Sequence, residues 1–391
     1  MYKTIAILGR QPALGIAELE SLFGADAVEP YGTNACFLKM KPHDVDFTRI
    51  GGSIRLCEII EESPVNWRNI ENKLLDIVPA YANEIEGKFS FGISSFGLSI
   101  TKKTIARSAL TIKKTIKQSG SSVRMVPHND LILGSATVLY NKLTAENGLE
   151  ICVISDGETA FIAKTIHVQN IDAYAARDQA RPMRDAKVGM LPPKLAQIII
   201  NLAVNKHSVE RILDPFCGTG VILQEATLMD YEVYGTDLEP RMVQYSIDNL
   251  LWLDEKYTHA SNFRRIEVGD ATTHQWHEPE KISVVAGETY LGQPLSALPS
   301  NEHLSKIMYE VNLLHHKFLV NIGKQIKPGT RLCLAVPTWR GKHEFLRLPA
   351  LDHITEMGYT RMSFKHAKDS DLIYHRVNQV VGRELLVLEK R

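Results

Sequence analysis

The chain has 391 residues, of which 44% are hydrophobic and 23% charged, and its 45 Lys and Arg are balanced by 45 Asp and Glu. This length exceeds the size at which one hydrophobic core keeps growing, so two or three domains are expected. A net charge of zero gives no argument for binding nucleic acid, so any such argument has to come from a local charge asymmetry.

The cysteine and histidine patterns predict neither a disulfide framework nor a metal site. The cysteines are scattered, without a Cys-x-x-Cys pair or zinc spacing, and the fourteen histidines show no ligand spacing. No stretch reaches about 18 apolar residues, and no signal peptide is recognisable. We therefore expect a cytoplasmic protein without a membrane span or a bound metal. The five cysteines are Cys36, Cys57, Cys152, Cys217 and Cys333.

Residues 1–165 have the pattern of a small α+β region. Apolar alternation indicates strands, and 3.6-residue periodicity indicates helices. The expected strands are 3–8, 35–40, 89–94, 122–126, 149–154 and 159–165. The expected helices are 15–23, a short one at 44–50, 104–118 and 136–142.

One segment of this region is strongly basic. Residues 101–124 contain seven Lys and Arg and not one acidic residue. Most charge runs are solvated helix faces, but basic residues on one face also neutralise a nucleic-acid backbone. Both interpretations stay open at this point.

Residues 166–190 contain few large apolar groups, as an inter-domain connection would, and we place the domain boundary near 175–190. Pro193 stands where proline fits at the start of a helix over 195–203. Strands then alternate with helices, which predicts a doubly wound parallel sheet. The expected strands are 211–213, 232–235, 265–268, 282–285, 331–336 and 384–388, with helices at 219–229, 239–252 and 302–326.

The most informative motif is Asp214-Pro-Phe-Cys-Gly-Thr-Gly220, where a buried strand runs into a glycine turn. Glycines allow the backbone to approach a small molecule closely, and ligands of doubly wound sheets bind at the carboxyl ends of the strands. The motif predicts a cradle for a nucleotide-type cofactor.

Three acidic residues, Asp214, Asp237 and Asp270, each stand just after a predicted strand. A carboxylate at the end of the second strand can accept hydrogen bonds from both ribose hydroxyls, and one on the third can meet an adenine amino group. The ordinary alternative for a single Asp here is a helix N-cap. Three in register after a glycine turn favour a binding site.

The cofactor is more consistent with S-adenosylmethionine than with NAD. The NAD fingerprint Gly-x-Gly-x-x-Gly would need a third glycine where Leu223 stands. S-adenosylmethionine has no phosphates; its amino-acid end needs an acid for the ammonium and backbone N–H groups for the carboxylate. Asp214 with Gly218 and Gly220 meets that need.

The chain resembles the THUMP-containing tRNA (guanine-N2) methyltransferases that act on position ten of tRNA. The resemblance extends over nearly the whole length. Its most specific parts are Arg181-Pro-Met-Arg-Asp185, Gly189-Met-Leu-Pro-Pro-Lys-Leu-Ala196 and Asp214–Gly220.

This resemblance implies a domain plan, a cofactor and a set of site residues. It implies a ferredoxin-like segment at 1–50, a THUMP RNA-binding domain at 51–170, a linker at 171–190 and a class I (Rossmann-like) methyltransferase domain at 191–391. S-adenosylmethionine is the implied cofactor and tRNA the implied partner. The expected cofactor-binding residues are Asp214, Phe216, Gly218, Gly220, Asp237, Leu238, Asp270 and Ala271. The expected RNA-binding residues are Lys102, Lys103, Arg107, Lys113, Lys114 and Lys117.

The sequence departs from the family after the fourth strand, where Asp/Asn-Pro-Pro-Tyr would hold the amine and stack on the flipped base. It has Gly287-Glu-Thr-Tyr-Leu-Gly292 there, without either proline. If Tyr290 keeps the stacking position, Gly287 replaces the acid; if Gly292 matches the glycine that often follows the motif, Glu288 takes the acid's place. We favour Glu288 and Tyr290 as catalytic residues.

Two other interpretations stay open. The missing prolines are compatible with a non-catalytic tRNA-binding protein that retains the cofactor fold. A DNA amino-methyltransferase would share the cofactor half but would leave residues 1–165 unexplained. Trp339 and Arg340, after the fifth predicted strand, are candidates for the base pocket or for phosphate contact, while core packing of Trp339 is the alternative.

Overall fold

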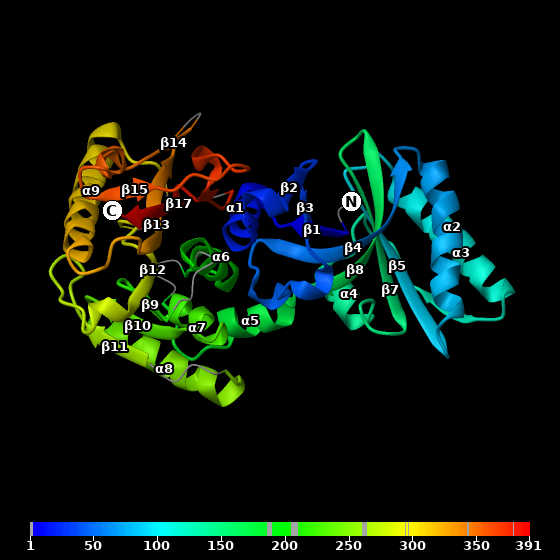
Figure 1. Ribbon diagram of the computed structural model, residues 1–391, viewed down its shortest axis with the longest axis horizontal. Coiled ribbons are helices and arrows are strands. Elements are labelled where there is room, and N and C mark those ends of the chain that lie inside the picture. Colours follow the sequence, from blue (N-terminus) through cyan, green and yellow to red (C-terminus); the bar gives the residue numbers. More distant parts are fainter. Residues whose placement is uncertain are drawn as a thin grey trace. The chain divides into compact units, whose positions relative to one another are not determined.

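A computed structural model describes residues 3–185, 190–204, 210–259, 264–293, 295, 297–341, 344–377 and 379–391. Residues 186–189, in the predicted linker and including Gly189, lie outside the described residues, as does Pro294 of the divergent loop. The chain forms two compact units, drawn in Figure 1. The first consists of Met1–Ile16, Gly24–Thr48 and Gly52–Tyr174; the second of Ala17–Phe23, Arg49–Gly51 and Ala175–Arg391.

The first unit is built on an eight-stranded sheet with the order β2-β3-β1-β4-β8-β7-β5-β6. The strands are β1 (Thr4–Leu8), β2 (Val28–Tyr31), β3 (Ala35–Leu38), β4 (Ser53–Pro64), β5 (Lys88–Phe96), β6 (Ser122–Met125), β7 (Gly148–Ser155) and β8 (Thr159–Val168). The helices are α2 (Trp67–Asn83), α3 (Lys102–Gln118) and α4 (Ser135–Tyr140), and α1 (Pro12–Phe23) is divided between the two units after Ile16. Most of the predicted elements are confirmed, whereas β2, β4 and α2 were not predicted.

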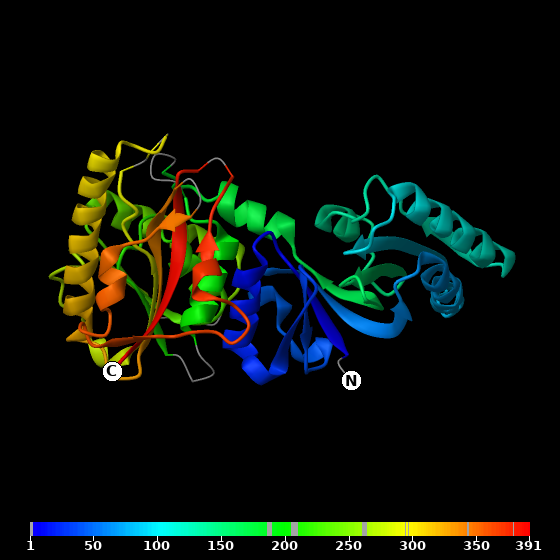
Figure 2. The same cartoon turned by 90° about the horizontal axis from the view of Figure 1, so that it is seen from above.

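Helices α2 and α3 lie side by side and bury their apolar faces in one cluster with β5 and β7 (Figures 1 and 2). In α3 the buried residues recur at spacings of one to four along the helix, which is the pattern of an amphipathic helix. These residues are Ile105, Ser108, Ala109, Ile112 and Ile116.

The predicted helix at 44–50 is wrong. The structure has two 3-10 turns there, Pro42–Asp44 and Phe47–Arg49. Asp46 Oδ1 accepts hydrogen bonds from both the backbone N–H (3.2 Å) and the hydroxyl (2.5 Å) of Thr48. Such local side-chain bonds compete with helix formation, and the segment is too short for the helix to win.

Strands from before and after residue 50 belong to the same sheet of the first unit. β1 pairs antiparallel with β3 on one side and with β4 on the other. The expected ferredoxin-like segment and THUMP domain thus share one sheet, and their division at residue 50 stays a sequence-based prediction. The expected connection at 171–190 contains a helix, α5 (Ile171–Gln179).

The second unit contains a sheet with the order β11-β10-β9-β12-β13-β17-β15. The first five strands are parallel, and β17 is antiparallel to both of its neighbours. The predicted doubly wound, mostly parallel α/β sheet is confirmed. Its strands are β9 (Arg211–Asp214), β10 (Glu232–Asp237), β11 (Arg264–Val268), β12 (Ile282–Glu288), β13 (Arg331–Arg340), β15 (Tyr359–Arg361) and β17 (Val381–Lys390), with β14 (Phe345–Leu346) on β13 and β16 (Ile373–Tyr374) on β17.

Helices cover both faces of this sheet, as parallel strands require. α9 (Asn301–Gly323) lies on one face, and α6 (Pro193–Ala203) and α7 (Val221–Leu228) lie on the other; α8 (Pro240–Lys256) packs against β10 and β11 (Figures 1 and 2). The central strands are buried almost throughout. Trp339 is fully buried in the cluster beneath α9, so core packing is its role. Strand order and helix placement direct the carboxyl ends of β9, β10 and β12 into one region.

Candidate functional site

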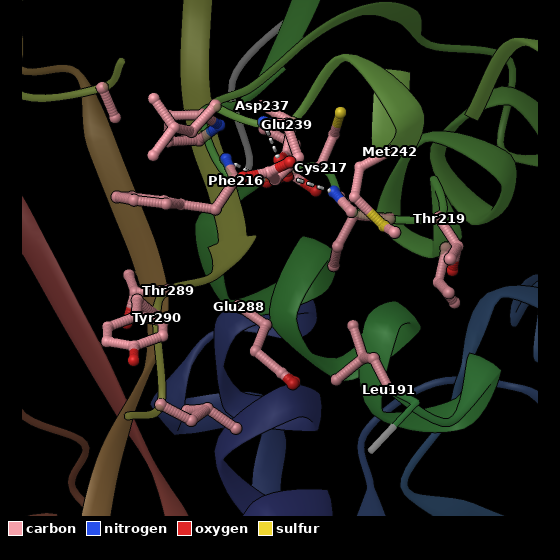
Figure 3. Close-up of a pocket in the computed structure, with 18 of the residues that line it drawn as sticks. Leu191, Phe216, Cys217, Thr219, Asp237, Glu239, Met242, Glu288, Thr289 and Tyr290 are labelled. Carbon is pink, nitrogen blue, oxygen red and sulfur yellow. Dashed lines mark hydrogen bonds between the residues drawn. The ribbon is translucent and has the colours of Figure 1, made fainter. Parts of the chain in front are cut away.

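A cavity of about 590 Å³ opens at the carboxyl ends of β9, β10 and β12 (Figure 3). It is lined by most of the residues predicted from the sequence, both for the cofactor and for the acceptor base. Those residues are Asp214, Phe216, Gly218, Asp237, Leu238, Asp270, Ala271, Glu288 and Tyr290. Gly220 is not part of the lining.

Gly220 serves the packing of the turn instead of the cavity. Its φ is 80°, and a Cβ there would lie 2.9 Å from Ser246 Oγ on α8. The Ser246 hydroxyl donates to the carbonyl of Gly218 at 2.8 Å. Gly218 also has a left-handed backbone, with φ 52°, and it faces the cavity. The two glycines thus have different tasks: one lets α8 approach, and the other lets a ligand approach.

The carboxylates of Asp237 and Asp270 accept hydrogen bonds from nearby backbone N–H groups, and both residues also line the cavity. Asp237 accepts the N–H of Gly218 on Oδ2 (2.9 Å) and that of Glu239 on Oδ1 (3.0 Å). Asp270 Oδ1 accepts the N–H (2.8 Å) and the hydroxyl (2.7 Å) of Thr272. A carboxylate has about four acceptor positions, so each still has room for ligand hydroxyl or amino groups.

Asp214 is almost completely buried, with 2% of its surface exposed, and Oδ1 accepts the N–H of Phe216 at 3.1 Å. Burial raises the pKa of this carboxyl well above its ordinary value; the N–H of Phe216 lowers it, and the charges of Asp237 and Glu288 raise it further. The raised pKa favours the protonated form of Asp214 until a cation binds beside it, because an opposite charge favours the ionised carboxylate. Such a site favours a positively charged ligand and disfavours a phosphate.

Gly287 has no room for a side chain. A Cβ at this position would lie 2.6 Å from Asp214 Oδ1. Glu288, the next residue, reaches the cavity with its side chain, which is 15% exposed. This supports the alignment in which Glu288 takes the acid's place.

Glu288 forms a bidentate ion pair with Arg383 of β17. Arg383 Nε donates to Oε1 (3.1 Å) and Oε2 (3.0 Å), and Nη2 donates to Oε1 (3.0 Å). Burial raises the pKa of Glu288, whereas the charge and hydrogen bonds of Arg383 lower it. Arg383 was not singled out from the sequence, although a charged residue inside the apolar run Val381–Lys390 signals a buried partner.

Thr289 is held on the other face of the sheet by a buried histidine. The backbone N–H of Thr289 donates to the carbonyl of Ala335 at 3.1 Å, and its Oγ1 lies 2.6 Å from His315 Nε2. His315 Nδ1 lies 2.7 Å from the carbonyl of Val311, which can only accept, so Nδ1 carries the proton. Burial lowers the pKa of His315 to about 4, so Nε2 of the neutral ring can accept the hydroxyl proton of Thr289. The carbonyl of Ala335, 3.1 Å from Oγ1, is the second acceptor for the same proton.

Tyr290 is 45% exposed, and its side chain points away from that of Glu288 (Figure 3). An aromatic ring exposed at the mouth of a cavity is suited to stacking with a planar base. The ring of Phe216, inside the cavity, is fixed by an edge-to-face contact with Phe318 at 5.0 Å.

Sequence reasoning missed Asn249, which braces the glycine turn. Its side chain exchanges two hydrogen bonds with the backbone of Met183, at 2.9 and 3.0 Å, and donates to the carbonyl of Thr219 at 2.8 Å. It thereby joins the predicted linker to the turn. A buried Asn within a helix was the available signal, because a buried amide needs partners.

The basic residues of α3 lie on its solvent side. Lys102, Lys103, Arg107, Lys114 and Lys117 are exposed, and Lys113 is half-buried. In the second unit, Arg340 Nη1 donates to the carbonyl of Val377 at 2.7 Å, and neither Arg340 nor Trp339 lines the cavity.

Within the described residues, no three or more His, Cys, Asp or Glu side chains gather as metal ligands would. Across the same ranges, every helix is too short or too polar to traverse a bilayer.

The chain is similar to known methyltransferases in both sequence and fold. The family model UPF0020, an RMKL-like methyltransferase domain, matches residues 181–361. The matched family model describes a methyltransferase domain and spans a little under half of the chain. The tRNA (guanine(10)-N2)-dimethyltransferase of Methanothermobacter thermautotrophicus is 33% identical over 162 residues, 41% of this chain and 43% of that protein. The protein of the same name from Methanocaldococcus jannaschii is 28% identical over 185 residues, 46% and 52% of the two chains. The chain thus covers about half the length of these relatives.

Two solved structures share the fold over nearly the whole length. TrmN from Thermus thermophilus aligns with a TM-score of 0.56 at 18% identity and covers 100% of both chains. A possible methylase from Clostridium difficile 630 aligns with a TM-score of 0.54 at 11% identity and covers 98% of this chain and 97% of that one. At these identities the likeness establishes the class I methyltransferase fold.

S-adenosylmethionine is the methyl donor of such a methyltransferase domain, and the cavity fits it. The molecule carries an ammonium and a sulfonium, which suit the negative end formed by Asp214 and Asp237. A pyrophosphate does not fit, because the N–H of Gly218 already donates to Asp237. Asp214 would hold the ammonium, Asp237 the ribose and Asp270 the adenine.

Proposed function

We propose that this protein is an S-adenosylmethionine-dependent tRNA methyltransferase that modifies the exocyclic N2 of a guanosine. The observation that carries the proposal is Glu288 beside Tyr290 in the same cavity as Asp214 and Asp237. The proposal draws further support from relatives that are named tRNA (guanine(10)-N2)-dimethyltransferase. We place the protein in the cytoplasm, where tRNA is available as a substrate. The five cysteines are free and buried, as is typical of proteins in a reducing compartment.

When bound, S-adenosylmethionine supplies an electrophilic methyl group. The protein then has to bring the amine nitrogen to about 3 Å from that carbon, in line with the breaking bond, and to exclude water. Tyr290 stacks on the extruded base, and Glu288 accepts an N–H of the amine, which turns the nitrogen lone pair toward the methyl group. As the new N–C bond forms, the bond between the methyl carbon and the sulfonium sulfur would break with its electron pair staying on sulfur. The proton that the amine loses would pass by way of the Glu288 carboxylate, which accepts that N–H, to water.

The basic face of α3 is the proposed contact for the tRNA backbone. Its exposed lysines and arginine stand opposite the buried face of the helix, so they approach a phosphate chain without disturbing the core. Phosphate contacts of this kind position the substrate and carry no sequence information. The choice of nucleotide then rests with the cavity.

The test is to incubate the purified protein with radiolabelled S-adenosylmethionine and tRNA from cells that lack this modification. We expect incorporation of label into N2-methylguanosine, identified by mass spectrometry of the nucleosides, and a loss of at least about 100-fold in Glu288→Ala. No incorporation across a complete tRNA pool would contradict the proposal. Calorimetry with S-adenosylmethionine separates a binding-only protein from one that does not bind the cofactor.

A further inference from the structure

The acid of the divergent loop is held by a residue from a distant strand. Arg383 of β17 makes three hydrogen bonds to the Glu288 carboxylate at 3.0 to 3.1 Å. Arg383 is buried, with 6% of its side chain exposed, and Glu288 is 15% exposed. The strands that carry them are not neighbours, because β13 lies between β12 and β17. The ion pair therefore joins β12 and β17 through side chains, in addition to the backbone hydrogen bonds that each strand makes with β13.

The arrangement leaves the carboxylate with unused acceptor capacity. Two of the three hydrogen bonds from Arg383 end on Oε1 and one on Oε2. A carboxylate has about four acceptor positions, so the remaining position is on Oε2. A bidentate guanidinium also fixes the plane of the carboxylate, which an isolated Glu with three rotatable bonds lacks.

We propose that Arg383 is a positioning residue for methyl transfer, which fixes the Glu288 carboxylate so that Oε2 accepts an N–H of the substrate amine. This inference rests on the proposed function. In the family that the chain resembles, a shorter acid stands before two prolines that stiffen its loop. Here the acid is one methylene longer, and Thr289 and Tyr290 follow it directly in place of the two prolines, so the orientation has to come from a contact elsewhere in the fold.

The charges around Glu288 make the influence of Arg383 measurable as a change in the pKa of Glu288. Arg383 faces it from β17, and Asp214 faces it from the end of β9. From α6, which packs on β12, the titratable residue is Lys194, half-buried at the start of the helix. Burial raises the pKa of Glu288 and Arg383 opposes this rise. Removing Arg383 therefore raises the pKa of Glu288 and increases the fraction that is protonated and unable to accept from the amine in the same way.

The first arm of the test follows the Glu288 carboxyl directly in the protein without ligands. NMR titration of protein labelled with ¹³C at the glutamate carboxyl carbons, assigned by comparison with Glu288→Gln, gives its pKa in wild type, Arg383→Gln and Arg383→Lys. We expect a rise in Arg383→Gln and a smaller one in Arg383→Lys, which keeps the charge but not the fork. An unchanged pKa in Arg383→Gln would overturn the inference.

The second arm measures methyl transfer as a function of pH. In Arg383→Gln we expect kcat near neutral pH to fall on the order of 100-fold, with recovery as the pH rises, while the affinity for S-adenosylmethionine stays unchanged. A purely structural role would instead lower activity equally at every pH. Arg361→Gln is the matched control, because Arg361 pairs with the buried Glu384 of β17 (2.8 Å) without lining the cavity.

Two outcomes separate failure of the inference from failure of the proposed function. If wild type transfers methyl groups and Arg383→Gln shows an unshifted pH profile, the positioning role is wrong and the proposed function stands. If wild type transfers none, the proposed function fails and the positioning role fails with it, whatever the titration gives. Should Arg383→Gln not fold by circular dichroism, Arg383→Lys supplies both measurements, and an unshifted profile there overturns the inference.

Discussion

Asp214 is a buried carboxyl group in the lining of the cavity, where we propose that it binds the ammonium of S-adenosylmethionine. Burial is the main cause of its raised pKa, and the charges of Asp237 and Glu288 raise that pKa further. A bound ammonium reverses this balance, because an opposite charge favours the ionised acid. Binding of the cofactor is therefore coupled to the loss of a proton from Asp214 at any pH below its raised pKa.

Asp214→Asn is expected to separate stability from binding. Asn keeps an oxygen for the N–H of Phe216 but carries no charge, so the variant should melt at a higher temperature near neutral pH, while its affinity for S-adenosylmethionine falls roughly 10- to 100-fold. In wild type the affinity should increase with pH through the raised pKa and then level off, whereas the variant should show no such increase. Calorimetric titration over a pH series, with thermal denaturation, measures both; a pH-independent affinity in wild type would contradict this account.

His315 gives a prediction about how the stability of the fold depends on pH. Its pKa is about 4 in the fold, below the ordinary 6.5, so the unfolded chain takes up the proton first. The neutral ring contributes stability in full above about pH 6.5, and this contribution is lost as the pH falls toward 4, by about 3 kcal/mol.

The measurement compares His315→Gln with wild type by urea unfolding at pH 7 and pH 4.5. Gln can still donate to Val311 and accept from Thr289 but does not titrate, so the loss of stability on acidification should be smaller in the variant. The neighbouring His316 is exposed, which makes His316→Gln the control. Equal losses in wild type and His315→Gln would refute the assignment of the neutral ring.

At the scale of elements, strand β12 decides which residue acts as the acid. Its last residue, Glu288, pairs with Arg383, and Thr289, the residue after the strand, contacts His315 of α9. Gly287, one residue earlier, abuts Asp214. The sequence left two alignments open because spacing alone cannot tell which of two adjacent residues faces a cavity.

Two substitutions distinguish these alignments. Gly287→Asp places an acid where the first alignment expects it, but its Cβ collides with Asp214 Oδ1, so we expect loss of cofactor binding and about 1–3 kcal/mol of destabilisation. Glu288→Asp keeps an acid on the correct side and should retain part of the methyl transfer. A gain of activity in Gly287→Asp, measured with labelled cofactor, would favour the alignment rejected here.

Elements with a clean local pattern were predictable, and the others were not. β9 and β12 contain short apolar runs and are buried almost throughout. Asp214 was found from its place after the first run, whereas Glu288 was found from the motif of the family that the chain resembles. β4 was missed because Glu58, Glu61 and Glu62 interrupt its alternation, and α2 contains Pro79, which ordinarily ends a helix. The segment 44–50 was wrongly predicted to be a helix. Its apolar pattern allows one, but Asp46 accepts local hydrogen bonds that compete with helix formation.

At the scale of the whole molecule, contacts between distant segments lay beyond prediction from one sequence. Arg383 and Glu288 are 95 residues apart, and Arg55 of β4 and Glu150 of β7 form a buried ion pair at 2.9 Å over the same separation. Local patterns contain no term for such pairs. The sequence predicted Glu288 as a site residue but not its ion pair with Arg383.

The basic face of α3 should make tRNA binding strongly dependent on salt. Each lysine or arginine that neutralises a phosphate contributes about one unit to the slope of log K against log salt concentration. Replacing Lys103, Arg107 and Lys114 by Ala should lower the slope by up to about 3. The control replaces three exposed lysines elsewhere, Lys256, Lys327 and Lys368. Filter binding at several salt concentrations gives the slopes, and an equal change in both variants would argue against α3 as the contact.

The link between Glu288 and Arg383 also sets an order of events during synthesis of the chain. β17 follows the other strands of its sheet in the sequence, yet it inserts between β13 and β15. Until residue 383 has been synthesised, Glu288 lacks the guanidinium partner that it has in the finished fold. The ion pair between Glu288 and Arg383 therefore cannot form until the residues of the glycine turn and the three strand-end acids have all been synthesised.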